Sequence, residues 1–185
     1  MRVIAGTFKG RVLKAPSWEG LRPTSDKLRE TLFNILAPRI AGARVLDGYA
    51  GTGAVGIEAC SRGAASVSFI ETNARATALI DENLALCGVR EGYTIHRGDV
   101  ASVLQRMPAD AQFDLVLLDP PYDADTVPQA LEAAAIRLAP GGLVVLERAS
   151  RRDPEIPSVL TRTRDVRSGD STLTFLIATF LTVQR

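Results

Sequence analysis

Histidine, cysteine and tryptophan are scarce in this chain, which has one His, two Cys and one Trp among 185 residues. The two cysteines, Cys60 and Cys87, lie far apart in helical patterns and form no CxxC pair, so we expect reduced, buried thiols that act as small hydrophobes. The single histidine, His96, lies inside a predicted strand and is expected to be structural. One His and two separated Cys do not make a zinc site, and we expect no metal.

Long apolar runs are also absent. No stretch approaches the length of a membrane span, and the N-terminal residues lack the basic and then long apolar pattern of a signal peptide. With 46% hydrophobic and 23% charged residues, the composition is that of an ordinary globular protein. The length suits one domain with a small appendage. We therefore expect a cytoplasmic protein without a membrane partner.

The net charge of +1 hides an uneven distribution. Residues 1–44 hold nine basic and three acidic side chains, including all three lysines, whereas the remainder holds thirteen basic and eighteen acidic ones. Such asymmetry predicts a basic arm that faces nucleic-acid phosphates, since each neutralised phosphate adds affinity without sequence information. The alternative is a solvated basic face.

Strand and helix patterns alternate along most of the chain, which predicts a parallel sheet covered by helices on both faces. A β-hairpin over 2–15 and a helix that reaches Pro38 come first. A final hairpin signal, Ser168-Gly169-Asp170-Ser171, separates two β-rich runs and predicts an antiparallel closure of the sheet. The expected strands are 45–47, 66–71, 93–97, 113–118, 143–147, 159–166 and 172–183; the expected helices between them are about 55–62, 73–86, 100–107 and 127–138.

Three glycines, Gly51, Gly53 and Gly56, join the first central strand to its helix. Gly51 and Gly53 allow positive φ and let a ligand lie against bare backbone, with the amides of a helix N-terminus pointing at it. The spacing satisfies the dinucleotide fingerprint, and Glu71 falls where a ribose-binding acid is expected, so a nicotinamide or flavin oxidoreductase must be considered. No Lys follows the glycines, which argues against a triphosphate-binding P-loop.

Asp47 precedes this loop and favours a different cofactor. A carboxylate there repels a pyrophosphate but suits a ligand with a sulfonium or ammonium charge. S-adenosylmethionine has both charges together with an adenosine. The alternative is that Asp47 only caps the loop and the glycines only make a turn.

Four acids, Asp47, Glu71, Asp99 and Asp119, each stand at the carboxyl end of a successive predicted strand, the edge at which open α/β sheets bind ligands. Glu71 is predicted to accept from the ribose hydroxyls, Asp99 from the adenine amine, and Asp47 to lie near the methionine end. Each acid alone could instead be a helix cap, Asp99 especially. The predicted cofactor-binding residues are Asp47, Tyr49, Gly51, Gly53, Glu71, Thr72, Asp99 and Val100, with the amide and side chain of Val100 framing the adenine.

The fourth acid opens Asp119-Pro120-Pro121-Tyr122, the most specific tetrapeptide of the chain. Two prolines stiffen the loop after a buried strand and fix a carboxylate, a carbonyl and an aromatic ring relative to one another. Asp119 and the Pro120 carbonyl can accept the two N–H groups of an aromatic amine, and Tyr122 can stack on its ring. We predict these four residues to be catalytic. The alternative is a stiff turn in which Tyr122 fills the core.

Asp-x-x-x-Gly-x-Gly followed by Asp-Pro-Pro-Tyr resembles class I S-adenosylmethionine-dependent amino-methyltransferases. More narrowly, the chain resembles the bacterial RsmD-type enzymes, which methylate N2 of a guanine in small-subunit (16S) ribosomal RNA. The segments that carry this resemblance are Met1-Arg2-Val3-Ile4-Ala5-Gly6, Arg22-Pro23-Thr24, Glu58-Ala59-Cys60-Ser61-Arg62-Gly63-Ala64 and Gly169-Asp170-Ser171. Gly48 and Thr52 depart from the usual pattern, which has a larger apolar residue and a Ser there.

The resemblance implies a Rossmann-like α/β methyltransferase domain over 41–185, with a mostly parallel seven-stranded sheet and a C-terminal antiparallel hairpin. Residues 1–40 form a basic hairpin and helix extension that is expected to bind RNA. The expected partner is ribosomal RNA, within the small subunit or an assembly intermediate, and the protein is expected to be a monomer. The predicted substrate-binding residues are Arg2, Lys9, Arg11, Arg22 and Thr24.

Two further alternatives remain open from the residues themselves. The tetrapeptide would accept adenine N6 or cytosine N4 as readily as guanine N2, so a DNA or RNA adenine-N6 methyltransferase is one. A non-catalytic RNA-binding module that keeps a vestigial pocket is the other.

Overall fold

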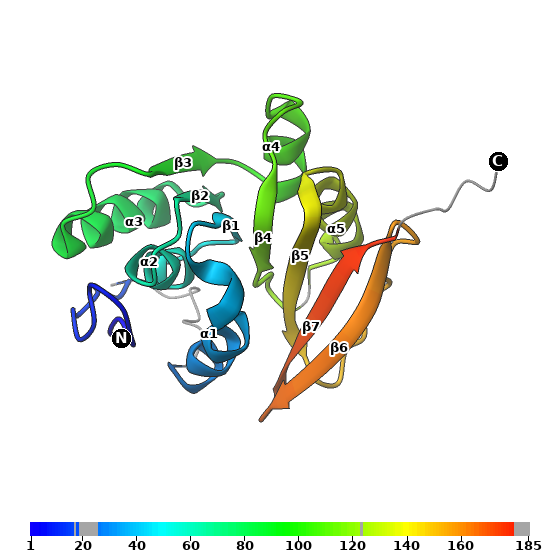
Figure 1. Ribbon diagram of the computed structural model, residues 1–185, viewed down its shortest axis with the longest axis horizontal. Coiled ribbons are helices and arrows are strands. Elements are labelled where there is room, and N and C mark those ends of the chain that lie inside the picture. Colours follow the sequence, from blue (N-terminus) through cyan, green and yellow to red (C-terminus); the bar gives the residue numbers. More distant parts are fainter. Residues whose placement is uncertain (17, 19–25, 123, 180–185) are drawn as a thin grey trace.

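The computed structural model describes residues 1–16, 18, 26–122 and 124–179. Within them the chain forms five helices and seven strands, and the strands make a single sheet (Figure 1). None of the helices in these ranges is both long and apolar enough to cross a membrane. In chain order the elements are α1 (Asp26–Ile40), β1 (Arg44–Gly48), α2 (Ala54–Ser61), β2 (Ser66–Glu71), α3 (Ala74–Cys87), β3 (Tyr93–Arg97), α4 (Val100–Arg106), β4 (Phe113–Leu118), α5 (Val127–Ile136), β5 (Leu138–Ala149), β6 (Leu160–Ser168) and β7 (Ser171–Ala178).

The strand order across the sheet is β3-β2-β1-β4-β5-β7-β6. Strands β1 to β5 pair in parallel, whereas β7 runs antiparallel to both β5 and β6. The prediction of a mostly parallel sheet closed by an antiparallel hairpin is confirmed. The strand order reverses between β1 and β4, and the carboxyl ends of strands at such a point are where open α/β sheets bind ligands.

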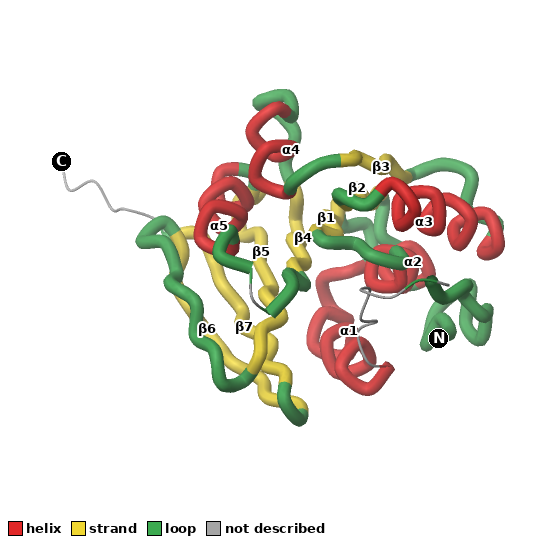
Figure 2. The backbone as a smooth tube through the Cα atoms, turned by 180° about the vertical axis from the view of Figure 1, so that it is seen from behind, coloured by secondary structure: helices red, strands yellow, loops and turns green. Residues whose placement is uncertain are grey.

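Strand β4 shows how the sequence supplies both faces of the sheet. Leu115 and Leu117 pack with α1, α2 and α3, whereas Val116 and Leu118 pack with α4 and α5 on the opposite face (Figures 1 and 2). All four side chains are at most 3% exposed, and each such burial stabilises the fold by about 1.5–3 kcal/mol. Residues 115–118 are all apolar because helices cover both faces of the strand.

Among the element boundaries that differ from the sequence prediction, two involve prolines. Helix α1 continues through Pro38 to Ile40, although a proline inside a helix removes one intrahelical amide donor. The predicted helix 127–138 ends at Ile136, and strand β5 begins at Leu138 instead of residue 143, with a register shift against β4 between Phe113 and Leu115. The Pro140-Gly141-Gly142 segment is therefore an irregularity within the strand and not the turn before it. The last predicted run, 172–183, is a strand as far as Ala178, and residues 180–185 lie outside the described ranges.

The predicted hairpin over 2–15 is present as a single antiparallel bridge between Arg2 and Val12, with no extended strands. The amide of Val3 donates to the Arg11 carbonyl at 3.0 Å, and the Gly10 amide donates to the Val3 carbonyl at 2.9 Å. So short a hairpin is not stable alone. It depends on contacts with the rest of the chain.

Glu58, in α2, is one of the residues that hold this hairpin. Its side chain is fully buried, and its two carboxylate oxygens accept from the amides of Ile4 at 2.8 Å and Ala5 at 3.0 Å. Arg62 balances the buried charge through a 2.7 Å contact from Nε. Gly6 lies so close to α2 that a Cβ there would be 1.8 Å from the Ser61 carbonyl oxygen. The hairpin is thus bound to the helix that begins at the glycine loop.

We expect Glu58→Ala to release the hairpin. The change leaves two backbone amides and the Arg62 guanidinium without their acceptor, and breaking a buried charge pair on one side costs about 3 kcal/mol. Urea unfolding should show this loss, and hydrogen exchange at Ile4 and Ala5 should accelerate. Glu132→Ala, at an exposed position of α5, is the control and should change neither. Unaltered exchange in Glu58→Ala would contradict the role assigned to Glu58.

Candidate active site

The loop between β1 and α2 turns through left-handed backbone three times. Tyr49 has φ 64°, Gly51 φ 56° and Gly53 φ 78°. The two glycines have the positive φ that the sequence predicts for them, whereas Tyr49 takes this conformation despite its side chain, which costs energy. Gly53 is the N-cap of α2 and supplies no side-chain hydrogen bond. Among the first-turn amides, that of Gly56 donates to the Asp47 carboxylate instead.

Asp47 lies beneath this loop and is 3% exposed. Its Oδ2 accepts from the Gly56 amide at 2.7 Å, so it does bind the loop, as the capping alternative predicts. Burial raises the pKa of Asp47 well above its ordinary value, and the nearby carboxylates of Asp119 and Glu71 raise it further. A positively charged ligand would favour the ionised form, which is what a sulfonium or ammonium group offers.

Glu71, at the end of β2, also holds the loop in place. Its Oε2 accepts from the Gly51 amide at 2.9 Å. Its Oε1 accepts from the Asn73 amide at 2.8 Å and from the Thr72 hydroxyl at 3.2 Å. An ionised carboxylate has about four acceptor positions, so these bonds orient Glu71 without using its full capacity to accept from a ribose.

Asp99 is the N-cap of α4 and accepts from the Ser102 amide at 3.0 Å. One carboxylate oxygen of Asp99 therefore caps α4, as the capping alternative predicts. The Val100 side chain is 2% exposed and packs between the sheet, α4 and α5. A contact between Val100 and an adenine ring would consequently come from the backbone amide and not from the side chain.

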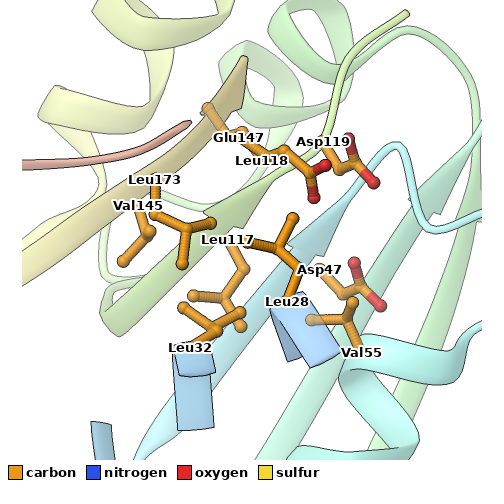
Figure 3. A pocket seen from close by; sticks show the side chains of 10 residues that line it. All are labelled: Leu28, Leu32, Asp47, Val55, Leu117, Leu118, Asp119, Val145, Glu147 and Leu173. Carbon is orange, nitrogen blue, oxygen red and sulfur yellow. The ribbon is translucent and has the colours of Figure 1, made fainter. Parts of the chain in front are cut away.

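Asp119 shares its surroundings with Glu147, an acid that was not among the predicted site residues. Asp47, Asp119 and Glu147 line one small cavity at the carboxyl edge of the sheet (Figure 3). The apolar part of its lining is formed by Leu28, Leu32, Val55, Leu117, Leu118, Val145 and Leu173. The signal for Glu147 was present in the sequence, because it ends the predicted strand 143–147 as the other acids end theirs.

Tyr122 is half-buried and held at both ends. Its hydroxyl lies 2.8 Å from the Ser171 hydroxyl, and its carbonyl accepts from the Arg152 guanidinium. Pro120, Pro121 and Tyr122 line a second hollow, which Arg152 and Glu147 also border. Ser171 belongs to the Gly169-Asp170-Ser171 turn, whose role was not readable from the sequence because the contact joins residues far apart in the chain.

Of the predicted substrate-binding residues, Arg2, Lys9 and Arg11 are exposed on the N-terminal hairpin. Arg22 and Thr24 lie outside the described residues. The hairpin is connected to the glycine loop through Asn83 of α3, whose amide nitrogen donates to the Thr52 carbonyl at 3.0 Å while its Oδ1 accepts from the Lys14 amide at 2.8 Å.

Comparison with known proteins shows relatives that match nearly the whole chain. The family model described as "Conserved hypothetical protein 95" matches residues 1–177. Ribosomal RNA small subunit methyltransferase D of Haemophilus influenzae is 34% identical over 173 residues, which cover 91% of this chain and 89% of the relative. The Escherichia coli protein of the same name is 38% identical over 122 residues, which cover 66% of this chain and 60% of the relative. The chain belongs to the RsmD family. The solved structure of yhhF from Escherichia coli superposes on 96% of this chain and 97% of its own with a TM-score of 0.84 at 29% identity.

Membership of the RsmD family makes the chain an S-adenosylmethionine-dependent methyltransferase and confirms the predicted enzyme class and cofactor. The site fits this cofactor. Two glycines present bare backbone, the N-cap residue of α2 supplies no side-chain hydrogen bond, and the buried carboxyl of Asp47 gains from a positive neighbour. The oxidoreductase alternative is set aside.

We expect Asp47→Asn to separate stability from cofactor binding. The amide oxygen can still accept from Gly56, but the charge is gone. Because the pKa of Asp47 is raised in the fold, ionisation opposes folding as the pH rises through that pKa, and the opposition disappears as the pH falls towards the ordinary value. The variant should lose this pH dependence in thermal unfolding without ligand. In calorimetry it should bind S-adenosylmethionine about 10- to 100-fold more weakly. Asp110→Asn, at an exposed position, should match the wild type; equal affinity in Asp47→Asn would contradict the assignment.

Proposed function

We propose that this RsmD-family enzyme transfers a methyl group to the exocyclic N2 of one guanine in small-subunit ribosomal RNA. The observation that carries the proposal is the position of Asp119-Pro120-Pro121-Tyr122 at the carboxyl edge of the sheet, between an apolar cavity and a second hollow. Relatives named ribosomal RNA small subunit methyltransferase D support the substrate class.

In this proposal the tetrapeptide orients a poor nucleophile. The lone pair of an exocyclic amine is delocalised into its ring. Asp119 and the Pro120 carbonyl accept its two N–H groups and Tyr122 stacks on the ring, which aligns the lone pair; placement of this kind supplies roughly 7–11 kcal/mol of a barrier. S-adenosylmethionine, when bound, supplies an electrophilic methyl group. The nitrogen needs no strong base beforehand, since it becomes acidic only once methylated, and Asp119 or water then takes the proton.

The proposed cofactor contacts follow from the same edge. Asp47 lies near the methionine end and Glu71 accepts from the ribose hydroxyls. The adenine is held by Asp99 and the Val100 amide. Gly51 and Gly53 allow close approach of the ligand to the backbone, and Tyr49 and Thr72 complete the proposed set.

The N-terminal extension, residues 1–40, is the proposed RNA-binding part. Within the described residues, Arg2, Lys9 and Arg11 form no ion pair, whereas Lys14 is paired with Glu82 at 2.8 Å. Unpaired exposed cations are the groups that release counterions from RNA at the least cost. The target nucleotide must leave its stack to reach Tyr122, which costs a few kcal/mol, and contacts from the extension offset that cost. We propose RNA within the small subunit or an assembly intermediate as the substrate.

Mass spectrometry of ribosomal RNA nucleosides tests the proposed reaction. Cells that lack the protein should lose one N2-methylguanosine per small subunit. Wild-type protein should restore it, and Asp119→Ala should not, because the amine loses a charged acceptor at the site of reaction. Asp110→Ala is the matched control and should restore the modification. Loss of N6-methyladenosine instead would favour the adenine alternative, and full restoration by Asp119→Ala would favour a non-catalytic RNA-binding module.

A second experiment tests the extension. Lys9→Gln combined with Arg11→Gln should weaken RNA binding at every sequence and reduce the slope of log K against log salt by about 1.5, since each lost phosphate contact contributes about 0.7–0.9. Titrations at several salt concentrations measure the slope. Arg90→Gln combined with Arg106→Gln removes the same charge at exposed positions outside the extension. An equal change of slope in both pairs would contradict a specific role for the extension.

A further inference from the structure

Glu147 occupies a position in the candidate active site to which the proposed mechanism gives no role. It follows Leu146, which pairs with Leu118 in the register of β4 and β5, so Glu147 and Asp119 are neighbours at the ends of adjacent strands. The residue is 8% exposed. Its side chain lies in the same cavity as that of Asp119 (Figure 3).

The two-residue period of the strands explains this arrangement. Val145 and Leu117 both pack on the face that α1 covers, and two residues further on Glu147 and Asp119 lie on that same face. Glu147 also borders the hollow that Tyr122 lines. It therefore lies between the carboxylate and the aromatic ring that the proposed function assigns to the target base.

The chemistry next to the reacting amine differs among the bases. In guanine the exocyclic N2 lies between two ring nitrogens, of which N1 carries a proton and is a donor, whereas N3 is an acceptor. In adenine the ring nitrogen beside N6, and in cytosine the one beside N4, carries a lone pair and is an acceptor. An ionised carboxylate only accepts hydrogen bonds. A second carboxylate beside Asp119 therefore attracts guanine and repels the other two bases.

Resting on the proposed function, we propose that Glu147 selects guanine by accepting a hydrogen bond from its ring N1–H while Asp119 accepts from N2. The remaining lining favours this selection, since Leu28, Leu32 and Leu173 are apolar, and a charged hydrogen bond is stronger in apolar surroundings. Asp47 is placed for a different role, because its Oδ2 accepts from the Gly56 amide. Glu147 thus provides the selectivity for guanine, and Asp119 aligns the amine.

The test uses a base that keeps the reacting amine and loses the neighbouring proton. In 2-aminopurine the exocyclic N2 is present, but N1 is an unprotonated acceptor. Small-subunit RNA assembled with its ribosomal proteins would have either guanine or 2-aminopurine at the mapped target position, and kcat/KM would be measured for both. The wild type should prefer guanine by about 10- to 100-fold.

Glu147→Gln is the decisive variant. Its amide is nearly the same size, and it can accept from N1–H or donate to a bare N1, so the preference for guanine should fall at least about tenfold, mainly through faster methylation of the 2-aminopurine substrate. The two bases also differ at position 6, so the readout is the change in this ratio between wild type and variant. Glu132→Gln, the same chemical change at an exposed position, should keep the wild-type ratio.

Thermal unfolding and calorimetry with S-adenosylmethionine show whether Glu147→Gln keeps its fold and its cofactor affinity, and both should match the wild type. An unchanged ratio in the folded variant overturns the role of Glu147 and leaves the proposed function standing. Failure of the wild type to methylate the guanine-containing particle overturns both. If Glu147→Gln does not fold, Glu147→Met takes its place. A methionine neither accepts from N1–H strongly nor repels a bare N1, so the same fall in ratio is expected, and an unchanged ratio again overturns the inference.

Discussion

The candidate site depends on one electrostatic constraint: three carboxyl groups, from Asp47, Asp119 and Glu147, share a small cavity with an apolar lining. Burial and the nearby carboxylates of Asp119 and Glu71 oppose ionisation of Asp47, which is why the pKa of Asp47 is raised. Local bonds offset only part of this cost, such as the 2.7 Å contact from the Gly56 amide at the positive end of α2. An arrangement of this kind is stabilised by ligands that bring positive charge or N–H donors. A cationic cofactor and an aromatic amine are such ligands.

Capping and ligand binding are compatible roles for the acids at this edge. Glu71 and Asp99 each hold backbone amides in place, through Gly51 and Asn73 in one case and Ser102 in the other. These bonds fix the carboxylates before any ligand arrives, so a ligand that binds them loses little to reorganisation. The two explanations that the sequence left open for these acids are therefore compatible with each other.

Three strands, 66–71, 93–97 and 113–118, were predicted to the residue. Each is a β-rich run with clear polar or glycine punctuation, so local pattern was sufficient. The extent of β5 was not predictable in this way, because only pairing with β4 tells an irregularity at Pro140 from the end of a helix. The sequence pattern places an acid at the end of each of these strands. It does not tell on which side of the sheet each acid lies, because that depends on the register of the strands. The contact between Tyr122 and Ser171 depends on the position of the closing hairpin, which a single sequence does not encode locally.

Helix α2 connects the basic extension to the cofactor loop. Near its start the Gly56 amide binds Asp47, and further along Glu58 binds the amides of Ile4 and Ala5. Val3 and Leu13 of the extension belong to the same buried cluster as Ile57 and Phe69, so the extension and the sheet share one hydrophobic core. The extension and the glycine loop are therefore both attached to one short helix by buried carboxylates. The buried glutamate costs desolvation, but its hydrogen bonds to Ile4 and Ala5 hold the extension beside the cofactor site.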